Sequence, residues 1–72
     1  MLKYKRIMNN NGVLQYEFYP EGDFLSPGIV EFKENEKPKV IQDSKKDVKR
    51  YYAMHAMNGI DLSKVTGTVA WY

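Results

Sequence analysis

The chain has 72 residues, with eleven Lys and Arg against nine Asp and Glu, and so a formal net charge of +2. A chain this short forms one domain, and it buries only roughly 60% of the surface that its unfolded form exposes. The absence of Cys excludes disulfides and thiolate metal sites. The small basic excess does not by itself indicate a polyanionic partner. No stretch approaches the ~20 apolar residues of a membrane-spanning helix, so we expect a cytoplasmic protein with no membrane partner.

The first predicted strand ends in a hairpin. Residues 2–8 predict a strand whose alternation of apolar and polar residues slips at Ile7. A bulge near Lys5-Arg6, or an edge position, would account for the slip. The run Asn-Asn-Asn-Gly at 9–12 consists of residues that reach positive φ at low cost, and it therefore predicts a hairpin turn.

The second strand has the clearest period of two in the chain. Residues 13–19 predict this strand. The side chains expected on its core face are those of Leu14, Tyr16 and Phe18. Pro and Gly bracket the next segment, 20–28, which predicts a loop with Phe24 and Leu25 at a hydrophobic tip.

The remaining elements complete an α+β domain. Residues 29–33 and 38–42 predict a third and a fourth strand, so four strands form an antiparallel β-meander. A helix follows within 43–60, and 65–72 predicts a final strand. The order β-β-β-β-α-β indicates a single small α+β domain spanning residues 1–72, with one helix packed across the sheet. The last strand pairs either with the first strand or with a neighbouring chain.

The helix carries a start signal and a stop signal. Ser44 and Asp47 have the spacing of a capping box, and Asn58-Gly59 supplies residues that tolerate a left-handed C-terminal turn. At 100° per residue one face gathers the residues expected to meet the sheet. They are Val48, Tyr51, Tyr52, His55, Ala56 and Gly59. Arg50 and Met57 fall on the opposite side, where Met57 is either an incidental exposed residue or part of a contact surface with Met54.

The chain shows no assembled catalytic or metal site. His55 is the only histidine, and its neighbours on the helix are Tyr51 and Tyr52 rather than a carboxylate or a nucleophile. We therefore expect a His at the edge of the core that hydrogen-bonds a Tyr or a backbone carbonyl. A single His without Cys or clustered carboxylates lacks a metal ligand set, and the glycines match no nucleotide-binding pattern. We expect neither enzymatic activity nor a cofactor.

Two sets of residues are candidates for binding. The first is a basic cluster that is a candidate for anions or nucleic acid, and it consists of Lys45, Lys46, Lys49 and Arg50. Strand aromatics such as Tyr4, Tyr16 and Tyr19 would then stack on bases. Nearby acidic residues dilute this field, so an ordinary solvated helix face is the favoured interpretation. The second set holds the interaction candidates Phe24, Leu25, Arg50, Met57, Trp71 and Tyr72.

Several short motifs in the middle of the chain resemble those of a known group of proteins. They are Tyr19-Pro20-Glu21-Gly22, Pro27-Gly28, Asp47 with Tyr51 or Tyr52, and His55-Ala56. Over roughly residues 16–60 the chain resembles small uncharacterised proteins of Gram-positive bacteria and their mobile elements. The resemblance implies a cytosolic bacterial protein and carries over no site residue.

The favoured interpretation is therefore a small interaction domain that binds another protein or forms a homodimer. The alternative is a nucleic-acid-binding module that uses the basic helix face and the sheet aromatics.

Overall fold

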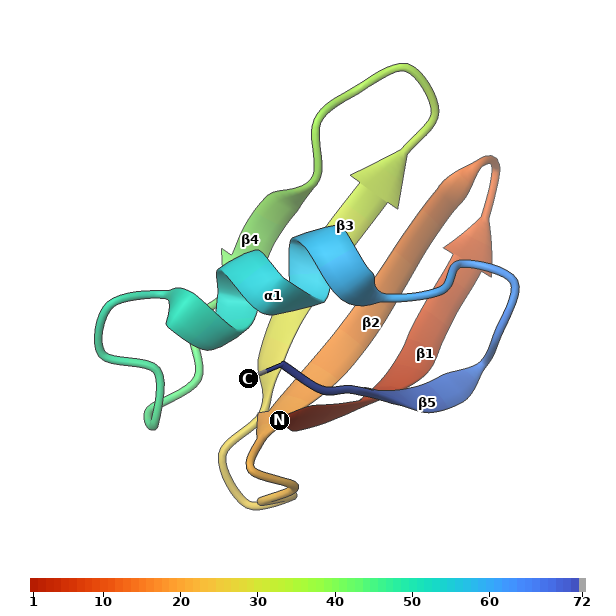
Figure 1. Cartoon of the computed structure of the whole chain (residues 1–72). Coiled ribbons are helices and arrows are strands. Elements are labelled where there is room, and N and C mark those ends of the chain that lie inside the picture. The colour runs from red at the N-terminus through yellow and green to blue at the C-terminus, as the bar shows by residue number, and fades with distance from the viewer. Residues whose placement is uncertain (72) are drawn as a thin grey trace.

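The computed structural model describes residues 1–71, which form five strands and one helix (Figure 1). In chain order the elements are β1 (Leu2–Asn10), β2 (Val13–Pro20), β3 (Gly28–Lys33), β4 (Lys39–Gln42), α1 (Tyr51–Gly59) and β5 (Thr66–Val69). All neighbouring strands are antiparallel, and their order in the sheet is β4-β3-β2-β1-β5. The predicted α+β class and the four-strand meander are confirmed. The last strand pairs with β1 of its own chain, with Leu2 opposite Val69.

A bulge in β1 explains the slip in its apolar pattern. The register with β2 shifts between Arg6 and Met8, which leaves Ile7 without a partner. The predicted bulge therefore lies one or two residues further along than Lys5-Arg6. The first half of β1 is not at an edge, because β5 pairs with it there.

The core lies between α1 and one face of the sheet, as Figure 1 shows. Its buried members are Leu2, Tyr4, Tyr16, Phe18, Val30, Phe32, Ala53, Ala56 and Ile60. The ring of Tyr16 is central to the core, in edge-to-face contact with Tyr4 at 5.6 Å and with Phe32 at 5.9 Å. Burying one large apolar side chain stabilises the fold by about 1.5–3 kcal/mol, so this cluster supplies much of the stability.

The helix begins later than the sequence predicts. Residues 43–50 form turns, and α1 begins at Tyr51 after Arg50, whose φ of 58° is left-handed. Asp47 nevertheless caps the helix, because its carboxylate accepts the backbone N–H groups of Tyr52 (3.2 Å) and Ala53 (2.9 Å). The predicted partnership with Ser44 is wrong, since that hydroxyl donates to the carbonyl of Ser26 and ties two loops together.

The end of the helix also differs from the prediction. No left-handed residue terminates α1, and Ile60 follows it in an extended conformation with φ −65°. Gly59 is needed for another reason. A Cβ added there would lie 2.6 Å from Cγ1 of Val69, so glycine allows β5 to pass close to the helix.

The predicted sheet-facing side of the helix is partly wrong. Val48 lies before the helix and is 90% exposed, and Tyr51 is also exposed. Ala56 is fully buried and Tyr52 packs beside the core, as predicted, but Ala53 is fully buried too and Met57 also packs against the core. Small residues allow the helix axis to approach the aromatic floor of the sheet closely, and larger ones at these positions would hold it away.

Within residues 1–71, no helix has the length and apolar character that crossing a bilayer requires.

Candidate functional site

An apolar groove of about 510 Å³ lies at the end of the molecule that carries the turn between β1 and β2 and the turn between β3 and β4. Its apolar floor combines strand residues with the C-terminal part of the helix and the segment after it, through Leu14, Phe32, Met57, Ile60 and Leu62. Its remaining lining residues are Gly12, Lys33, Glu34, Glu36 and Pro38. Concave sites for small molecules and peptide side chains have volumes of about 300–1,000 Å³, so the groove has the size of a binding site.

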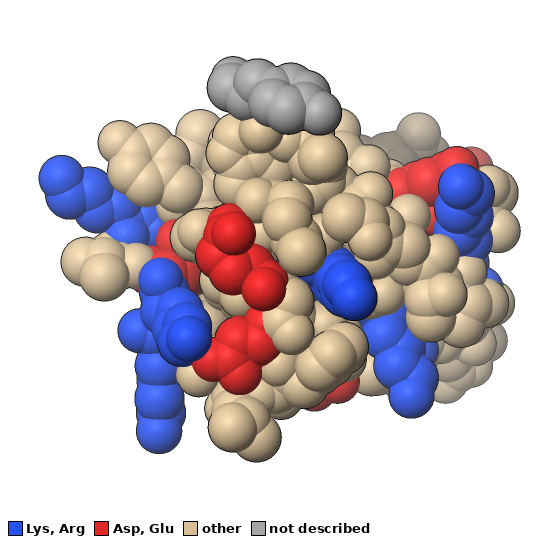
Figure 2. Space-filling model, turned by 60° about the horizontal axis from the view of Figure 1, so that its bottom comes forward, with Lys and Arg blue, Asp and Glu red and all other residues tan. Residues whose placement is uncertain are grey.

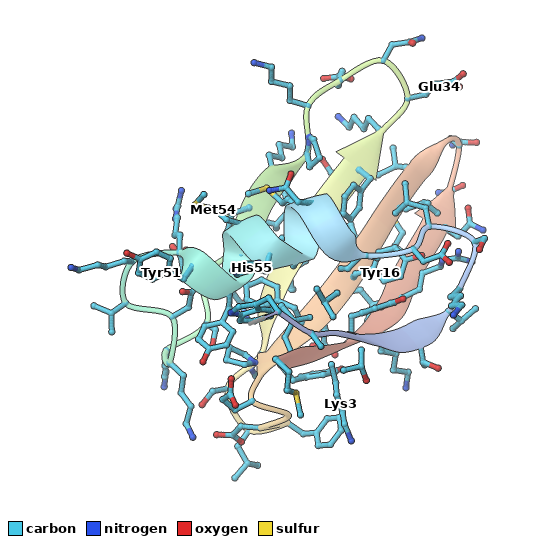
Figure 3. The ribbon with its side chains drawn as sticks, viewed as in Figure 1. Lys3, Tyr16, Glu34, Tyr51, Met54 and His55 are labelled. Atoms are coloured by element: carbon cyan, nitrogen blue, oxygen red, sulfur yellow. The ribbon has the colours of Figure 1, made fainter. Side chains whose placement is uncertain are left out.

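Two of the three charged residues that line the groove are acidic, and Lys37 in the same turn is exposed but is not among the lining residues. Glu34 and Glu36 are exposed in the turn between β3 and β4, and Figure 3 shows Glu34 on this turn, beyond the strand ends. Lys33 also lines the groove, but its ammonium group lies 3.9 Å from Glu31 on the strand. Within residues 1–71, no cation lies within ion-pair distance of Glu34 or Glu36.

One wall of the groove is fixed by a buried hydroxyl and a guanidinium group. Tyr16 donates its hydroxyl hydrogen to the carbonyl of Lys64 at 2.8 Å, and Nε of Arg6 donates to the same hydroxyl at 3.1 Å. Nη2 of Arg6 donates to the carbonyl of Leu62 at 2.8 Å. These bonds attach the segment after α1 to the sheet, although it has no regular secondary structure. The groove wall is therefore preorganised.

A local turn completes this wall. The carboxylate of Asp61 accepts both the backbone N–H (2.9 Å) and the hydroxyl (2.6 Å) of Ser63, and these bonds hold the pKa of Asp61 below its ordinary value. The N–H of Lys64 bonds to the carbonyl of Asp61 at 3.0 Å. Such Asx turns hold a loop in shape without support from a helix or a strand.

The predicted interaction residues Phe24 and Leu25 lie at the opposite end of the molecule from the groove. Phe24 contacts the ring of Tyr19 with a centroid distance of 4.7 Å and is still largely exposed. Leu25 is 92% exposed, and its loop is tied to residues 43–50 by an ion pair between Asp23 and Lys46 at 2.7 Å. That ion pair and the N–H of Leu25 lower the pKa of Asp23.

Arg50 and Met57 do not share a surface. Arg50 is exposed beside the first turn of α1, and both Nε and Nη2 donate to the carboxylate of Asp43. This ion pair raises the pKa of Arg50 further. Met57 points to the other end, where it packs against the core and lines the groove. Met54, the neighbour considered for a shared contact surface, lies exposed on the outer side of the helix (Figure 3).

Trp71 folds back onto the helix. Its ring stacks on His55 with a centroid distance of 3.8 Å and an interplanar angle of 6°, and it meets Tyr52 edge to face at 5.5 Å. Among residues 1–71, no Tyr or carbonyl makes the expected hydrogen bond with His55, whose ring makes an aromatic contact. Tyr72, the other terminal candidate, lies outside the described residues.

The basic cluster is dispersed by its acidic neighbours. Lys46 pairs with Asp23 and Arg50 with Asp43, which leaves Lys45 and Lys49 as the exposed members without an ion pair inside the described part of the chain. Figure 2 turns this end of the molecule toward the viewer, and basic side chains there flank an acidic group instead of forming one continuous field. Lys3 and Lys5 lie on the sheet face away from the helix and do not extend the cluster.

The strand aromatics are not presented to a ligand. Tyr4 and Tyr16 are buried beneath the helix. Tyr19 lies on the open face of the sheet but is only 5% exposed, and its hydroxyl donates to Glu17 at 2.8 Å. Burial and the neighbouring Glu17 carboxylate raise the pKa of Tyr19 to about 12. Stacking of bases on these three rings would require the fold to open.

A second hollow of about 310 Å³ lies on the open face of the sheet. It is lined by Lys3, Tyr4, Lys5, Tyr19, Phe24, Thr66, Gly67 and Thr68. Elsewhere on the sheet, on β3, Glu31 is a buried carboxylate, with Lys39 at 3.2 Å and a hydrogen bond from Gln15 at 2.9 Å. The lining of this hollow is largely cationic and hydroxyl-bearing, through Lys3, Lys5, Tyr19, Thr66 and Thr68. It offers less apolar surface than the groove.

Metal-binding side chains are not gathered in the described structure. Among residues 1–71, no three His, Cys, Asp or Glu side chains lie close enough to hold one ion. The expectation that the protein needs no cofactor stays a prediction.

No known family, characterised protein or solved structure matches this chain at a significant level. The resemblance to small proteins of Gram-positive bacteria therefore stays a prediction, and the groove is interpreted from its own chemistry.

The groove is the feature that the sequence pattern did not predict. Met57 was a candidate on other grounds, but nothing in the pattern placed it beside Leu14 and Phe32. The signal that pointed toward the wall was the alternation in β1, because Arg6 continues the core face of Tyr4 and lies opposite Tyr16 in the sheet.

Proposed function

We propose that this protein is a small interaction domain that binds an aliphatic segment of a protein partner in the apolar groove. The observation that supports this proposal is a preformed groove with an apolar floor whose wall is fixed by Arg6 and Tyr16. A preorganised site does not pay the entropy of ordering its own loops on binding, so more of the contact energy appears as affinity. The resemblance and the lack of Cys further lead us to expect a bacterial, cytosolic protein without enzymatic activity.

The two acidic residues that line the groove favour one kind of partner. A segment with an aliphatic side chain next to Lys or Arg would place its cation near Glu34 or Glu36 while the apolar group enters the groove. Charges at the edge of a binding site chiefly set the association rate and the selectivity, whereas the buried apolar anchor sets most of the affinity.

Selection of peptides tests the proposal. Random peptides displayed on phage are selected on the immobilised protein, with counter-selection on Leu62→Lys. This change places a cation in the groove at a side chain that is 42% exposed, so the fold is retained. We expect selected peptides to carry a large aliphatic residue and to bind the wild type at least tenfold more tightly than Leu62→Lys. Peptides that bind both proteins equally would refute the proposal.

The alternative of nucleic-acid binding has its own test. Retention on heparin or single-stranded DNA that falls steeply with salt would support that alternative, because phosphate contacts release counterions. We expect no retention at moderate salt, since two of the four basic side chains in the cluster are already paired.

A further inference from the structure

One end of the molecule carries a patch that matches the groove at the other end. We define the loop patch as Leu25, Lys45, Val48 and Lys49. Leu25 and Val48 are the two most exposed large apolar side chains in the described chain, at 92% and 90%. Both lie in turns, where exposed apolar side chains gain nothing from the fold itself.

The two loops of this patch are held together. The hydroxyl of Ser44 donates to the carbonyl of Ser26, and Nε2 of Gln42 donates to the carbonyl of Pro27 at 3.1 Å. Lys46 adds its ion pair with Asp23. These contacts join the two loops that carry the residues of the loop patch.

The patch and the groove are complementary in both polarity and charge. The two loops of the patch carry two exposed aliphatic side chains and the exposed cations Lys45 and Lys49, and the groove presents an apolar floor beside Glu34 and Glu36. Neither pair of charges has an ion-pair partner within residues 1–71. Opposite charges around an apolar contact fix its register and exclude partners of the wrong sign.

The two surfaces cannot meet within one molecule. The turn between β3 and β4 that forms the groove rim stands at the top of Figure 1, and the loops 20–28 and 43–50 lie at the bottom and lower left. Contact between them therefore requires a second chain. Such a contact joins different surfaces of two copies, so it leaves a free groove at one end and a free patch at the other.

From this we infer that the protein self-associates head to tail, with the loop patch of one copy seated in the groove of the next. This inference rests on the proposed function, because it names a second copy of the chain as the occupant of the groove. Head-to-tail contacts form rings if the rotation between copies closes and open chains if it does not. A C2 dimer is not expected.

Two single variants test the inference by complementation. Val48→Asp disables the patch and leaves the groove intact, whereas Leu62→Lys disables the groove and leaves the patch intact. Met54→Gln is the matched control, because Met54 is an exposed apolar residue outside both surfaces. Urea unfolding of all three should match the wild type, since Val48 is almost fully exposed and Met54 and Leu62 are about half exposed.

Sedimentation equilibrium gives the readout. We expect the wild type and Met54→Gln to gain mass with concentration, less so at high salt, and each disabled variant to associate at least about tenfold more weakly, as on loss of an interface anchor. Mixed in equal amounts, Val48→Asp and Leu62→Lys should form a heterodimer that grows no further, since only one intact groove and one intact patch meet.

The opposing outcomes are distinct. A wild type that stays monomeric at the highest concentration, or a mixture that forms no heterodimer, would overturn the inference. The proposed function would survive that result if selected peptides still bound the wild type and lost affinity for Leu62→Lys. If the selected peptides also bound the wild type and Leu62→Lys equally, the self-association and the proposed function would both be refuted.

Discussion

Nη2 of Arg6 donates a hydrogen bond to the backbone carbonyl of Leu62 across 2.8 Å, although 56 residues separate the two in the chain. The bond joins the first strand of the sheet to the segment that forms a wall of the groove. The guanidinium carbon also lies 5.5 Å from the centroid of the Tyr16 ring. A planar group with donors on several edges can make all of these contacts together, and lysine cannot.

Replacement of Arg6 by Met should loosen the groove without unfolding the protein. The variant keeps the aliphatic stem and loses the donors to Leu62 and Tyr16, which we expect to lower the free energy of unfolding by about 1 kcal/mol. Its affinity for a selected peptide should fall about tenfold, because the wall is no longer held. Isothermal titration and urea unfolding measure the two effects. Lys5→Met, which removes one cation from the open face, is the control and should change neither.

The buried carboxylate of Asp47 should be the main stabiliser of the helix start. Asp47→Ala leaves the N–H groups of Tyr52 and Ala53 without acceptors, so we expect a loss of about 1–2 kcal/mol. Thermal unfolding followed through Trp71, the only tryptophan, should show a lower midpoint. Asp43→Ala breaks only an exposed ion pair with Arg50 and should cost less than about 1 kcal/mol. Equal losses would contradict the capping role.

The contact between Gly59 and Val69 should reverse the usual preference of helices for alanine. In an open helix, Gly→Ala stabilises by about 1 kcal/mol. Here the added Cβ meets Cγ1 of Val69, so we expect Gly59→Ala to destabilise by about 1–3 kcal/mol as an overpacked site does. In a Val69→Ala background the same change should be neutral or stabilising. A double-mutant cycle from urea unfolding measures this coupling, and additive effects would show that the two residues do not clash.

Glu31 should contribute to the acid sensitivity of the fold. A hydrogen bond from Gln15, together with the nearby charges of Lys39 and Lys33, lowers its pKa below 4.5. A carboxylate with a lowered pKa in the folded state stabilises the protein above its ordinary pKa, and this contribution disappears as the pH falls through the lowered value. Stability measured by urea unfolding between neutral and strongly acidic pH should therefore fall less steeply for Glu31→Gln. Identical pH profiles for both proteins would contradict this role.

The strands could be predicted because each depends on local signals. The alternation over Leu14, Tyr16 and Phe18 identified β2 and its buried face, and the run ending in Asn11-Gly12 identified the turn before it. Pairing of β5 with β1 is a long-range choice between the first strand and a neighbouring chain. No local pattern could decide it.

The helix start could not be predicted from spacing alone. Asp47 does cap α1, but through N–H groups five and six residues later, because Arg50 adopts a left-handed conformation between them. A capping-box pattern assumes a continuous helix. With the start displaced to Tyr51, Val48 lies outside the helix, and Ala53 joins the predicted Ala56 on the side that faces the sheet.

The groove could not be predicted because its lining comes from three separate parts of the chain. Met57, Leu14 and the turn after β3 meet only once the sheet order and the direction of the helix are fixed. Residues such as Phe24 and Leu25 stood out in the sequence because they are apolar residues in a loop. An apolar residue within a predicted loop can be identified in a sequence, whereas a concave surface cannot.

The central claim is that the groove around Met57 receives an aliphatic segment. The four methionines provide a direct test, because labelling of their methyl carbons gives four NMR signals of which only that of Met57 lies in the groove. On titration with a selected peptide, we predict a large shift of the Met57 signal and little change at Met1, Met8 and Met54. A Met57 signal that stays unchanged at saturating peptide would contradict the account.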